Sequence, residues 1–372
     1  MLAIGDYQTT YHRTRCLLDG LRSRGVEVAE APLRFRLRDK MFSWRWLPFW
    51  GMELAGRYLR LALAARRWRG RYVFVPYGSF FDVPVARLIA WWKRARVISD
   101  PVIFLHDTRL FNKPRPGEGA AEARLAYFTD VVAYRWPDIR IFDTEANRAY
   151  AGRAYGVRAC GSYVVPVGAD ESVFKPAEPG RRNAPGTLDV IWYGRVSLMH
   201  GLDVILKAAG LLLEEPGIRF TIIGDRNSSY FDPADLARAE GRNLTMRHWG
   251  RPESILPADL AGWAREHDAA LGCFGDTRKA RETLITKEYE ALAMGLPLIT
   301  RDRGAANGIL RSGETAWLVP AADPEALAGA VRALAWSPEK RDSLGRAGRA
   351  AFLAACSRDR IVDQFLKILE EN

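Results

Sequence analysis

The sequence predicts an α/β protein with two Rossmann-like domains that face a central cleft. Its 372 residues exceed what one ordinary hydrophobic core encloses, which favours two domains. In both halves short apolar runs alternate with helical patterns, as they do in parallel sheets. Between the halves, residues 170–187 are rich in proline, glycine and charge and have little periodicity, which is typical of a linker. Ligands of such sheets bind beyond the carboxyl ends of the strands.

The first half begins with a short apolar strand at residues 2–4 and a helical pattern at 13–25. That helix ends at Gly25, as helices commonly do. Further strands are expected at residues 26–28, 72–76, 97–98, 102–105, 139–143 and 164–167, with a helix at 144–156.

The second half repeats the alternation. Strands are expected at residues 188–193, 220–223, 244–249, 269–274, 296–300 and 316–319, and helices at 202–215, 258–266, 287–294 and 324–336. The expected boundaries are a first domain at 1–170, a linker at 171–187 and a second domain at 188–352. A C-terminal helix at about 353–372 is expected to pack back on the first domain.

The composition is that of a soluble globular protein, with 48% hydrophobic and 27% charged residues. No apolar run approaches the roughly 18–20 residues of a membrane span, and the first residues lack the apolar region of a signal peptide. The four cysteines are scattered singly, which suggests neither a disulfide framework nor a zinc site. These features predict a cytoplasmic protein.

Positive charge is concentrated in one window. Residues 34–96 hold fifteen Lys or Arg against three acidic residues, and six of the twelve tryptophans, whereas the net charge of the whole chain is +11. Interleaved Arg and Trp suit the headgroup layer of an anionic membrane. A nucleic acid would also attract such a window, and a solvated Arg-rich helix is the remaining alternative. We favour the membrane over nucleic acid, with membrane contacts at Arg66, Arg67, Trp68, Arg69 and Arg71.

A glycine and an arginine follow the expected strand at 188–193. Gly194 allows close backbone approach to a phosphate, and Arg195 can fork onto a diphosphate. His200 and Gly201 precede the next helix, whose N-terminus carries a positive dipole. Taken alone, the pattern also fits a surface arginine beside a helix start. The P-loop pattern is absent, so ordinary ATP hydrolysis is not indicated.

Two glutamates separated by seven residues flank a helix start further along the chain. Glu282 is expected in a polar turn, and Glu290 about one turn into the helix that follows. Backbone N–H groups of residues 283–287 would point toward an anion. A carboxylate accepts hydrogen bonds from vicinal hydroxyls, so both glutamates suit a sugar or a ribose. Alternatively, the helix dipole alone favours Glu at this place.

Together these motifs resemble the retaining nucleotide-sugar glycosyltransferases of the GT-B fold, family 4, also called group 1. The resemblance includes Arg195 to Gly201 after a strand, the E-x7-E-A pattern and AMGLPLIT. The segments VVPVGADESVFKP and SGETAWLVPAADPEALAGAV add to it. It extends over residues 160–350 and is looser before, where it rests on YHRTRCLLDGLRSRGVEV and FLHDT.

The resemblance implies an acceptor domain followed by a donor domain, and a role for each motif. Arg195 and His200 would hold the donor diphosphate, Glu290 the ribose and Glu282 the transferred sugar. The family often has lysine at the position of His200, so the affinity of this chain for the diphosphate would depend on pH. The implied donor-binding residues are Gly194, Arg195, His200, Gly201, Glu282, Thr283, Leu284, Ile285, Thr286, Lys287 and Glu290.

In the first domain the resemblance places His106 of FLHDT near the reacting sugar. Asp107 and Asp100 are close in sequence and are alternative catalytic residues. Many members carry a Gly-Gly loop near the N-terminus, whereas this chain has Gly5 followed by Asp6. The acceptor therefore cannot be inferred by analogy.

The implied reaction moves a sugar from a nucleotide-sugar co-substrate, UDP- or GDP-linked by family habit, with retention at the anomeric carbon. The expected acceptor is a hydroxyl that is lipid-linked or near a membrane. No Asp-x-Asp pair is present, so we expect neither a metal nor a further cofactor. The alternatives are a sugar-nucleotide epimerase or phosphorylase on the same fold, or a non-catalytic basic membrane-binding protein.

Overall fold

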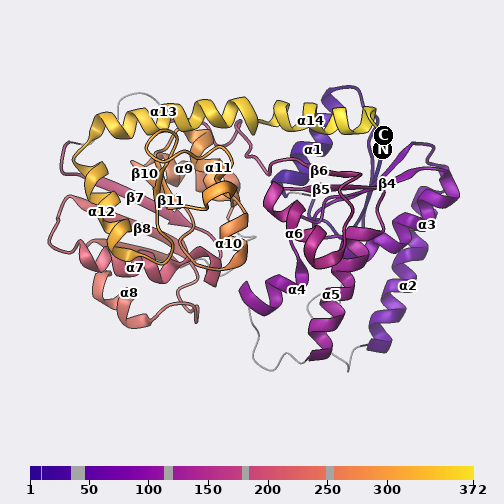
Figure 1. Cartoon of the computed structure of the whole chain (residues 1–372), viewed down its shortest axis with the longest axis horizontal. Coiled ribbons are helices and arrows are strands. Elements are labelled where there is room, and N and C mark those ends of the chain that lie inside the picture. Colours follow the sequence, from indigo (N-terminus) through magenta and orange to yellow (C-terminus); the bar gives the residue numbers. More distant parts are fainter. Residues whose placement is uncertain (10, 35–46, 113–119, 178–183, 249–254) are drawn as a thin grey trace. The chain divides into compact units, whose positions relative to one another are not determined.

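The computed structural model describes residues 1–9, 11–34, 47–112, 120–177, 184–248 and 255–372 (Figure 1). Two compact units divide the chain. The first consists of Met1–Pro166 with Ile361–Asn372, and the second of Val167–Arg360. Residues 178–183 of the expected linker and residues 35–46 of the basic window lie outside the described residues.

A six-stranded parallel sheet forms the centre of the first unit, in the order β2-β1-β3-β4-β5-β6. The inner strands have buried apolar residues because helices cover parallel sheets on both faces, whereas the edge strand β2 has no buried residue. Their bounds are Leu2–Gly5 (β1), Ala29–Pro32 (β2), Tyr72–Val75 (β3), Arg96–Ser99 (β4), Ile139–Phe142 (β5) and Ser162–Val164 (β6).

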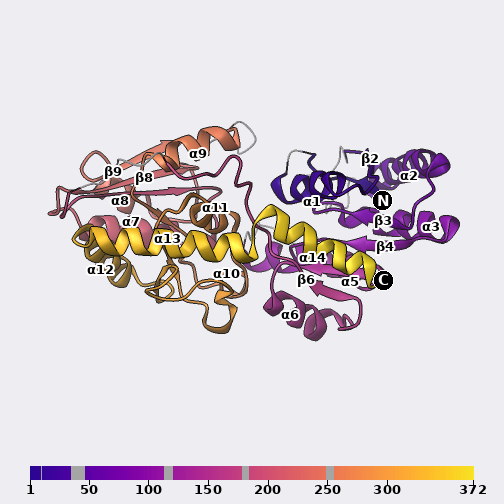
Figure 2. The same cartoon turned by 90° about the horizontal axis from the view of Figure 1, so that it is seen from above.

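The helices of the first unit surround this sheet. They are α1 (His12–Ser23), α2 (Leu47–Ala64), α3 (Val83–Lys93), α4 (Leu105–Asp107), α5 (Ala120–Arg135), α6 (Glu145–Tyr155) and α14 (Arg358–Glu370), with the 3₁₀ turns η3 (Ala65–Arg67) and η4 (Phe80–Asp82). Phe365 of α14 packs edge-to-face against Phe74 of β3. The last helix therefore belongs to the core of the first unit, beside α1 and β6 (Figure 2).

The second unit also has a six-stranded parallel sheet, in the order β12-β11-β10-β7-β8-β9. This is the Rossmann order. The strands are all parallel, but their order along the chain reverses between β7 and β10. The bounds are Leu188–Tyr193 (β7), Ile218–Gly224 (β8), Leu244–His248 (β9), Ala269–Leu271 (β10), Leu298–Arg301 (β11) and Trp317–Val319 (β12). A ligand of this sheet is expected at the carboxyl ends of β7 and β10.

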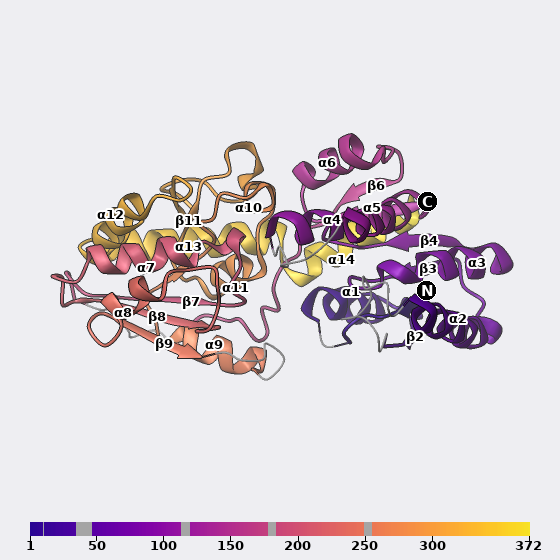
Figure 3. The same cartoon turned by 90° about the horizontal axis from the view of Figure 1, so that it is seen from below.

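Helices flank the second sheet as well (Figure 3). They are α7 (Leu202–Leu211), α8 (Pro233–Ala239), α9 (Pro257–Arg265), α10 (Arg278–Glu282), α11 (Thr286–Met294), α12 (Pro324–Ala335) and α13 (Pro338–Ala355). Apolar side chains of α7, α8 and α12 form one core with Val190 and Trp192 of β7. The two sheets confirm the predicted α/β class with two Rossmann-like halves.

One predicted strand is wrong and two are displaced, one of them from residues 164–167 to Ser162–Val164. Residues 102–105 form no strand, because Val102 has a left-handed backbone with φ of 62° and Leu105 begins α4. The strand expected at residues 26–28 lies instead at Ala29–Pro32. No helix that the structure describes is long and apolar enough to cross a membrane.

Candidate functional site

The loop after β7 turns sharply at Gly194. Its φ is 137°, a conformation that L side chains rarely adopt, and a Cβ there would lie 3.0 Å from Lys287 Nζ. Arg195 follows and is exposed. A hydrogen bond of 2.9 Å joins His200 Nδ1 to Ser197 Oγ. The sharp turn therefore brings the loop directly against α11.

Gly201 fixes the other end of this loop. It is left-handed, and a Cβ would meet Gly275 N at 2.5 Å and Phe274 at 2.7 Å, in the segment after β10. The amide of Phe274 donates to His200 O over 3.0 Å. The predicted phosphate loop is thus bound to the end of β10, at the point where the strand order reverses.

Glu282 ends a short helix rather than occupying a turn. It is the last residue of α10 and forms an ion pair with Arg278, a partner that the sequence analysis missed. The signal that could have found Arg278 is its spacing of four residues from Glu282. The pair holds the Glu282 carboxylate at the end of α10, four residues before α11 begins.

Two of the amides predicted to face an anion donate within the protein. Thr283 donates its N–H to Lys279 O, and Ile285 donates its N–H to Glu288 Oε2 over 2.9 Å. Thr286 and Lys287 open α11, where amides lack an intrahelical acceptor. Leu284 lies between the two helices and its side chain is buried.

Lys287 is buried in an aromatic and polar setting. Its Nζ lies 3.7 Å from the centroid of the Trp192 ring, and no hydrogen-bond acceptor among the described residues is within its reach. Burial lowers the pKa of this ammonium to about 7. An unsatisfied ammonium at a strand switch point can receive an anion.

Glu290 faces the end of β7. Tyr193 OH donates to Glu290 Oε2 over 2.8 Å, and both side chains are buried. Burial raises the pKa of Glu290 to about 7, although the tyrosine bond and the charge of Lys287 oppose that shift. The other carboxylate oxygen can accept from a hydroxyl group.

A buried network that the sequence analysis missed holds α11 in place. Glu288 accepts from Arg303 over 2.7 Å and also from the hydroxyl of Thr300 in β11. A Cβ at Gly272 would lie 2.5 Å from Glu288 Oε1, so only glycine fits there. The sequence spacing gave no hint of these partners. The network fixes the helix that carries both Lys287 and Glu290.

In the first unit the loop after β1 is held by one carboxylate. Gly5 has φ of 117°, and a Cβ there would lie 2.7 Å from Asp82 Oδ2. The amide of Asp6 donates to that oxygen over 2.9 Å. Arg57 of α2 forks onto the same carboxylate at 2.7 and 2.5 Å. The predicted Gly5–Asp6 loop is therefore anchored to α2.

His106 lies on the short helix α4. Its ring is partly buried and packs edge-to-face against Tyr127. Burial lowers the pKa of His106, although the neighbouring Asp107 opposes that shift. Asp130 of α5, which the sequence analysis missed, accepts the amides of Leu105 and His106 at 2.9 Å each. Asp130 thereby fixes the start of this helix.

The other two catalytic candidates are buried. Asp107 is almost inaccessible. Asp100 forms a two-pronged ion pair with Arg13 at 2.7 and 2.9 Å, and Arg13 also donates to Pro166 O. The Asp100–Arg13 pair has the geometry of a structural ion pair, whereas a general base requires an available carboxylate.

The predicted membrane residues differ in exposure. Arg66, Arg67, Arg69 and Arg71 are exposed. Trp68 is only partly buried and packs against the core that includes Leu61 and Val83. The arginines therefore present their charges to solvent, whereas the tryptophan contributes to the fold.

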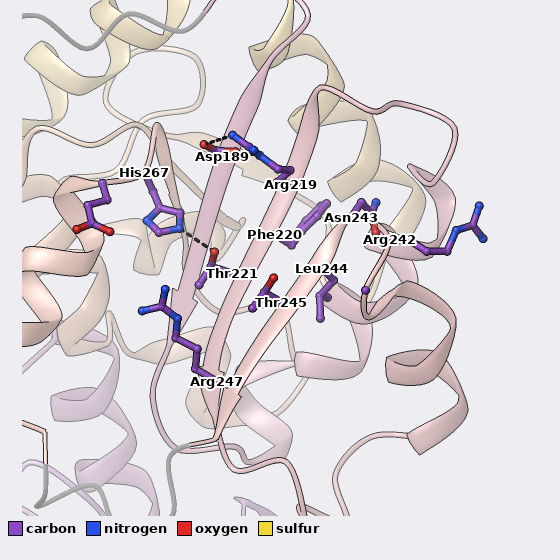
Figure 4. A pocket seen from close by; sticks show the side chains of 12 residues that line it. Asp189, Arg219, Phe220, Thr221, Arg242, Asn243, Leu244, Thr245, Arg247 and His267 are labelled. Atoms are coloured by element: carbon purple, nitrogen blue, oxygen red, sulfur yellow. Dashed lines mark hydrogen bonds and ion pairs between the residues drawn. The ribbon is translucent and has the colours of Figure 1, made fainter.

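A separate hollow of about 430 Å³ lies on the second unit (Figure 4). Most of its lining comes from the amino ends of β7, β8 and β9, on the opposite edge from the predicted donor residues. Its polar side chains already bind one another: Arg219 pairs with Asp189, and His267 Nε2 lies 2.8 Å from Thr221 Oγ1. We therefore assign it no ligand. Among the described residues, no cluster of His, Cys, Asp and Glu is placed to hold a metal ion.

Comparison with known proteins finds a family model that matches part of the second unit. Residues 187–336 match the family model of the glycosyl transferases group 1. A D-inositol 3-phosphate glycosyltransferase from an Arthrobacter species is 28% identical over 222 residues, which cover 55% of this chain and 51% of that protein. Spore coat protein SA of Bacillus subtilis is 26% identical over 190 residues, which cover 49% and 48%. The chain thus spans about half the length of the curated relatives it matches.

Solved structures extend the likeness to the whole chain. Sucrose-phosphate synthase from Thermosynechococcus elongatus superimposes with a TM-score of 0.72 at 15% identity, covering 100% of this chain and 98% of that one. The Anabaena protein HepE, solved in complex with UDP-glucose, gives 0.70 at 14% identity, covering 100% and 99%. At such identities the likeness concerns the fold alone.

Proposed function

Because residues 187–336 carry the sequence of the group 1 glycosyltransferases and the chain has the GT-B fold, we propose that this protein transfers a sugar from a nucleotide-sugar donor to an acceptor hydroxyl. One observation carries the proposal. The buried ammonium of Lys287 lies beside the Gly194 turn and has no acceptor among the described residues. A donor diphosphate would supply that acceptor.

Each residue of the proposed site binds a different part of the nucleotide sugar. Lys287 and Arg195 bind the diphosphate, and His200, where the family often has lysine, donates a third hydrogen bond to it. Glu290 accepts from the ribose hydroxyls through the oxygen that Tyr193 leaves available. Glu282 accepts from the transferred sugar. The burial of Lys287 compensates for the missing lysine, since a desolvated cation attracts phosphate strongly.

The proposed reaction retains the anomeric configuration. The acceptor oxygen attacks the anomeric carbon on the face that the diphosphate leaves, and the sugar–phosphate bond breaks. The acceptor proton passes to the departing phosphate oxygen, so the nucleoside diphosphate leaves with it. Lys287, Arg195 and His200 stabilise the charge that develops on that diphosphate, which is where preorganised cations act most strongly.

We propose His106 as the residue nearest the reacting sugar and give Asp100 a structural role. Asp130 holds the backbone amide of His106, and Tyr127 packs against its partly buried ring, whereas the Asp100 carboxylate is bound by Arg13. UDP- or GDP-hexoses are the proposed donors, and the cations of the donor site take the place of a metal. The proposed acceptor is lipid-linked or lies close to a membrane.

A thermal-shift panel of UDP, GDP, ADP, dTDP and CMP tests the donor site on wild type and Glu290→Ala. A ligand that binds only the native state raises the melting temperature. We expect one nucleotide to stabilise the wild type selectively and the variant much less. Absence of any shift with well-folded protein would refute the donor site.

Turnover separates the remaining alternatives. With the matching nucleotide sugar and a mixture of lipid and sugar acceptors, a transferase releases nucleoside diphosphate only when the acceptor is present. An epimerase converts the donor without releasing the nucleotide, and a phosphorylase requires inorganic phosphate. Binding without any conversion would identify a non-catalytic protein.

A further inference from the structure

Helix α2 carries large apolar side chains on the face that points to solvent. These side chains are Phe49, Met52, Leu59 and Leu63. Their spacings of three, seven and four residues keep them on one side of a helix. Arg57 and Leu61, on the other side, are buried against the protein. A surface helix ordinarily presents polar residues to solvent, so these exposed apolar side chains are unusual.

Helix α3, beside α2, also exposes large apolar side chains, in addition to the apolar side chains that it buries. Leu88, Trp91 and Trp92 share one face, and Trp91 is 82% exposed. The two helices contact each other and lie side by side in all three views of the chain (Figures 1, 2 and 3). Both also pack on the same core cluster. We call their exposed apolar side chains together the α2–α3 face.

Positive charge borders the α2–α3 face. The exposed arginines near it are Arg60, Arg66, Arg67, Arg69, Arg71 and Arg94. Residues 47–96 contain only two acidic side chains. Asp82 is buried and bound to Arg57, and Glu53 is half-buried. Within residues 47–96 the surface therefore combines exposed apolar side chains with cations, and only the half-buried Glu53 offers an acidic group that is not fully buried.

We propose that the α2–α3 face docks on an anionic lipid bilayer. Apolar side chains of this size gain free energy by entering the acyl boundary, and neighbouring arginines pair with lipid phosphates. Trp91 and Trp92 have the amphipathic rings that settle at headgroup level, and Lys93 already places its ammonium 4.2 Å from the Trp92 ring centroid.

Two other occupants fit the surface less well. In a symmetric dimer the face would meet its own copy, so the rows of arginines would oppose each other and repel. A nucleic acid would engage the arginines through its phosphates, but it would leave Met52, Leu59 and Leu63 without a role. The bilayer satisfies both the apolar and the charged parts of the face.

The test is co-sedimentation of the full chain with vesicles of equimolar phosphatidylcholine and phosphatidylglycerol. The triple variant Met52→Ser, Leu59→Ser, Trp91→Ser should bind at least about tenfold less, because each change removes one apolar insertion. The matched control is Leu211→Ser with Trp336→Ser, which removes exposed apolar side chains from the second unit and should bind as the wild type does. Neutralising Arg66, Arg67, Arg69 and Arg71 should weaken binding and remove most of its salt dependence.

Three results would overturn the proposal. The wild type fails to sediment with these vesicles, the triple variant sediments as the wild type does, or light scattering shows a dimer that the triple variant abolishes. The nucleotide thermal shift is measured on the same samples. Since the docking proposal does not depend on the transfer activity, a retained shift with lost vesicle binding, or the reverse, shows which of the two proposals failed.

Discussion

The Lys287 ammonium lies 3.7 Å from the centre of the Trp192 ring, within the second unit. The ring supplies a weak partner to a cation that burial otherwise disfavours. The folded protein therefore keeps an anion-binding ammonium out of water before any ligand arrives. Its desolvation lowers the stability of the ligand-free protein, and the binding of an anion offsets that loss.

Lys287→Met should stabilise the ligand-free protein and weaken its binding of nucleoside diphosphate. Removing a buried group with a lowered pKa should raise the free energy of unfolding at pH 7 by about 2–4 kcal/mol. Losing its charged hydrogen bonds should weaken diphosphate binding by roughly ten- to a hundredfold. Urea unfolding and calorimetric titration with UDP and GDP measure the two effects. If the variant is less stable than the wild type and binds nucleoside diphosphate with the same affinity, Lys287 is not the diphosphate-binding group.

Lys287 should also make stability depend on pH. Its pKa is about 7 in the folded protein, against 10.5 for an ordinary lysine, so the unfolded chain binds more protons between these values. The free energy of unfolding, which the buried Lys287 lowers at pH 7, therefore increases as pH rises from about 7 to about 10. We expect the stability difference between Lys287→Met and the wild type to shrink over that range. A difference that is constant with pH would show that Lys287 titrates normally.

The same titration should appear in ligand binding. A bound diphosphate favours the charged lysine, so binding takes up a proton above pH 7 and diphosphate affinity falls as pH rises further. Calorimetry in buffers of different ionisation enthalpy measures the proton uptake. Lys287→Met serves as the control and should show little uptake above pH 7. Equal uptake in both proteins would assign the proton to another group.

His106→Ala should remove turnover and leave the donor site intact. General acid–base or orienting groups at a reacting centre contribute about a hundredfold or more to the rate. The nucleotide thermal shift should stay close to that of the wild type, because the donor residues belong to the other unit. His248→Ala, at an exposed histidine, is the matched control. A variant with normal turnover would leave His106 with a structural role only.

Asp100→Asn should act on stability. It leaves the buried Arg13 guanidinium without its counter-charge, which costs about 3–5 kcal/mol. Glu240→Gln breaks an exposed pair with Arg226 and should cost less than about 1 kcal/mol. Chemical unfolding measures both. If Asp100→Asn folds as stably as the wild type but has no turnover, Asp100 is catalytic after all.

Most of the architecture could be predicted from the sequence because most strands are short segments built around buried apolar residues. Leu188–Tyr193 matches its predicted bounds, and its six residues are all buried. The failure at residues 102–105 has the same origin, since a short apolar run does not distinguish a strand from a buried loop and helix start. At this place Asp130, 24 positions from His106, accepts the backbone amides that begin helix α4, and the local sequence does not reveal that contact.

The candidate site was only partly accessible to sequence reasoning. The spacing of Glu282 and Glu290 identified the segment, and the glycine after β7 identified the turn. The burial of Lys287 against Trp192 could not be foreseen, since it depends on two strands and a helix meeting at one edge. The pairing of Asp100 with Arg13, 87 positions away, was equally invisible.

The carboxylate of Asp82 joins Arg57 of α2 to the backbone of Asp6. Although the basic, tryptophan-rich window looks like an added module in the sequence, it cannot be exchanged as one. A chimera that replaces α2 with a helix from another protein would leave Asp82 buried without its cation and would release the turn after β1. A redesigned helix in this place would have to keep Arg57 or replace both partners together, whereas its solvent-facing side chains would be under no such constraint.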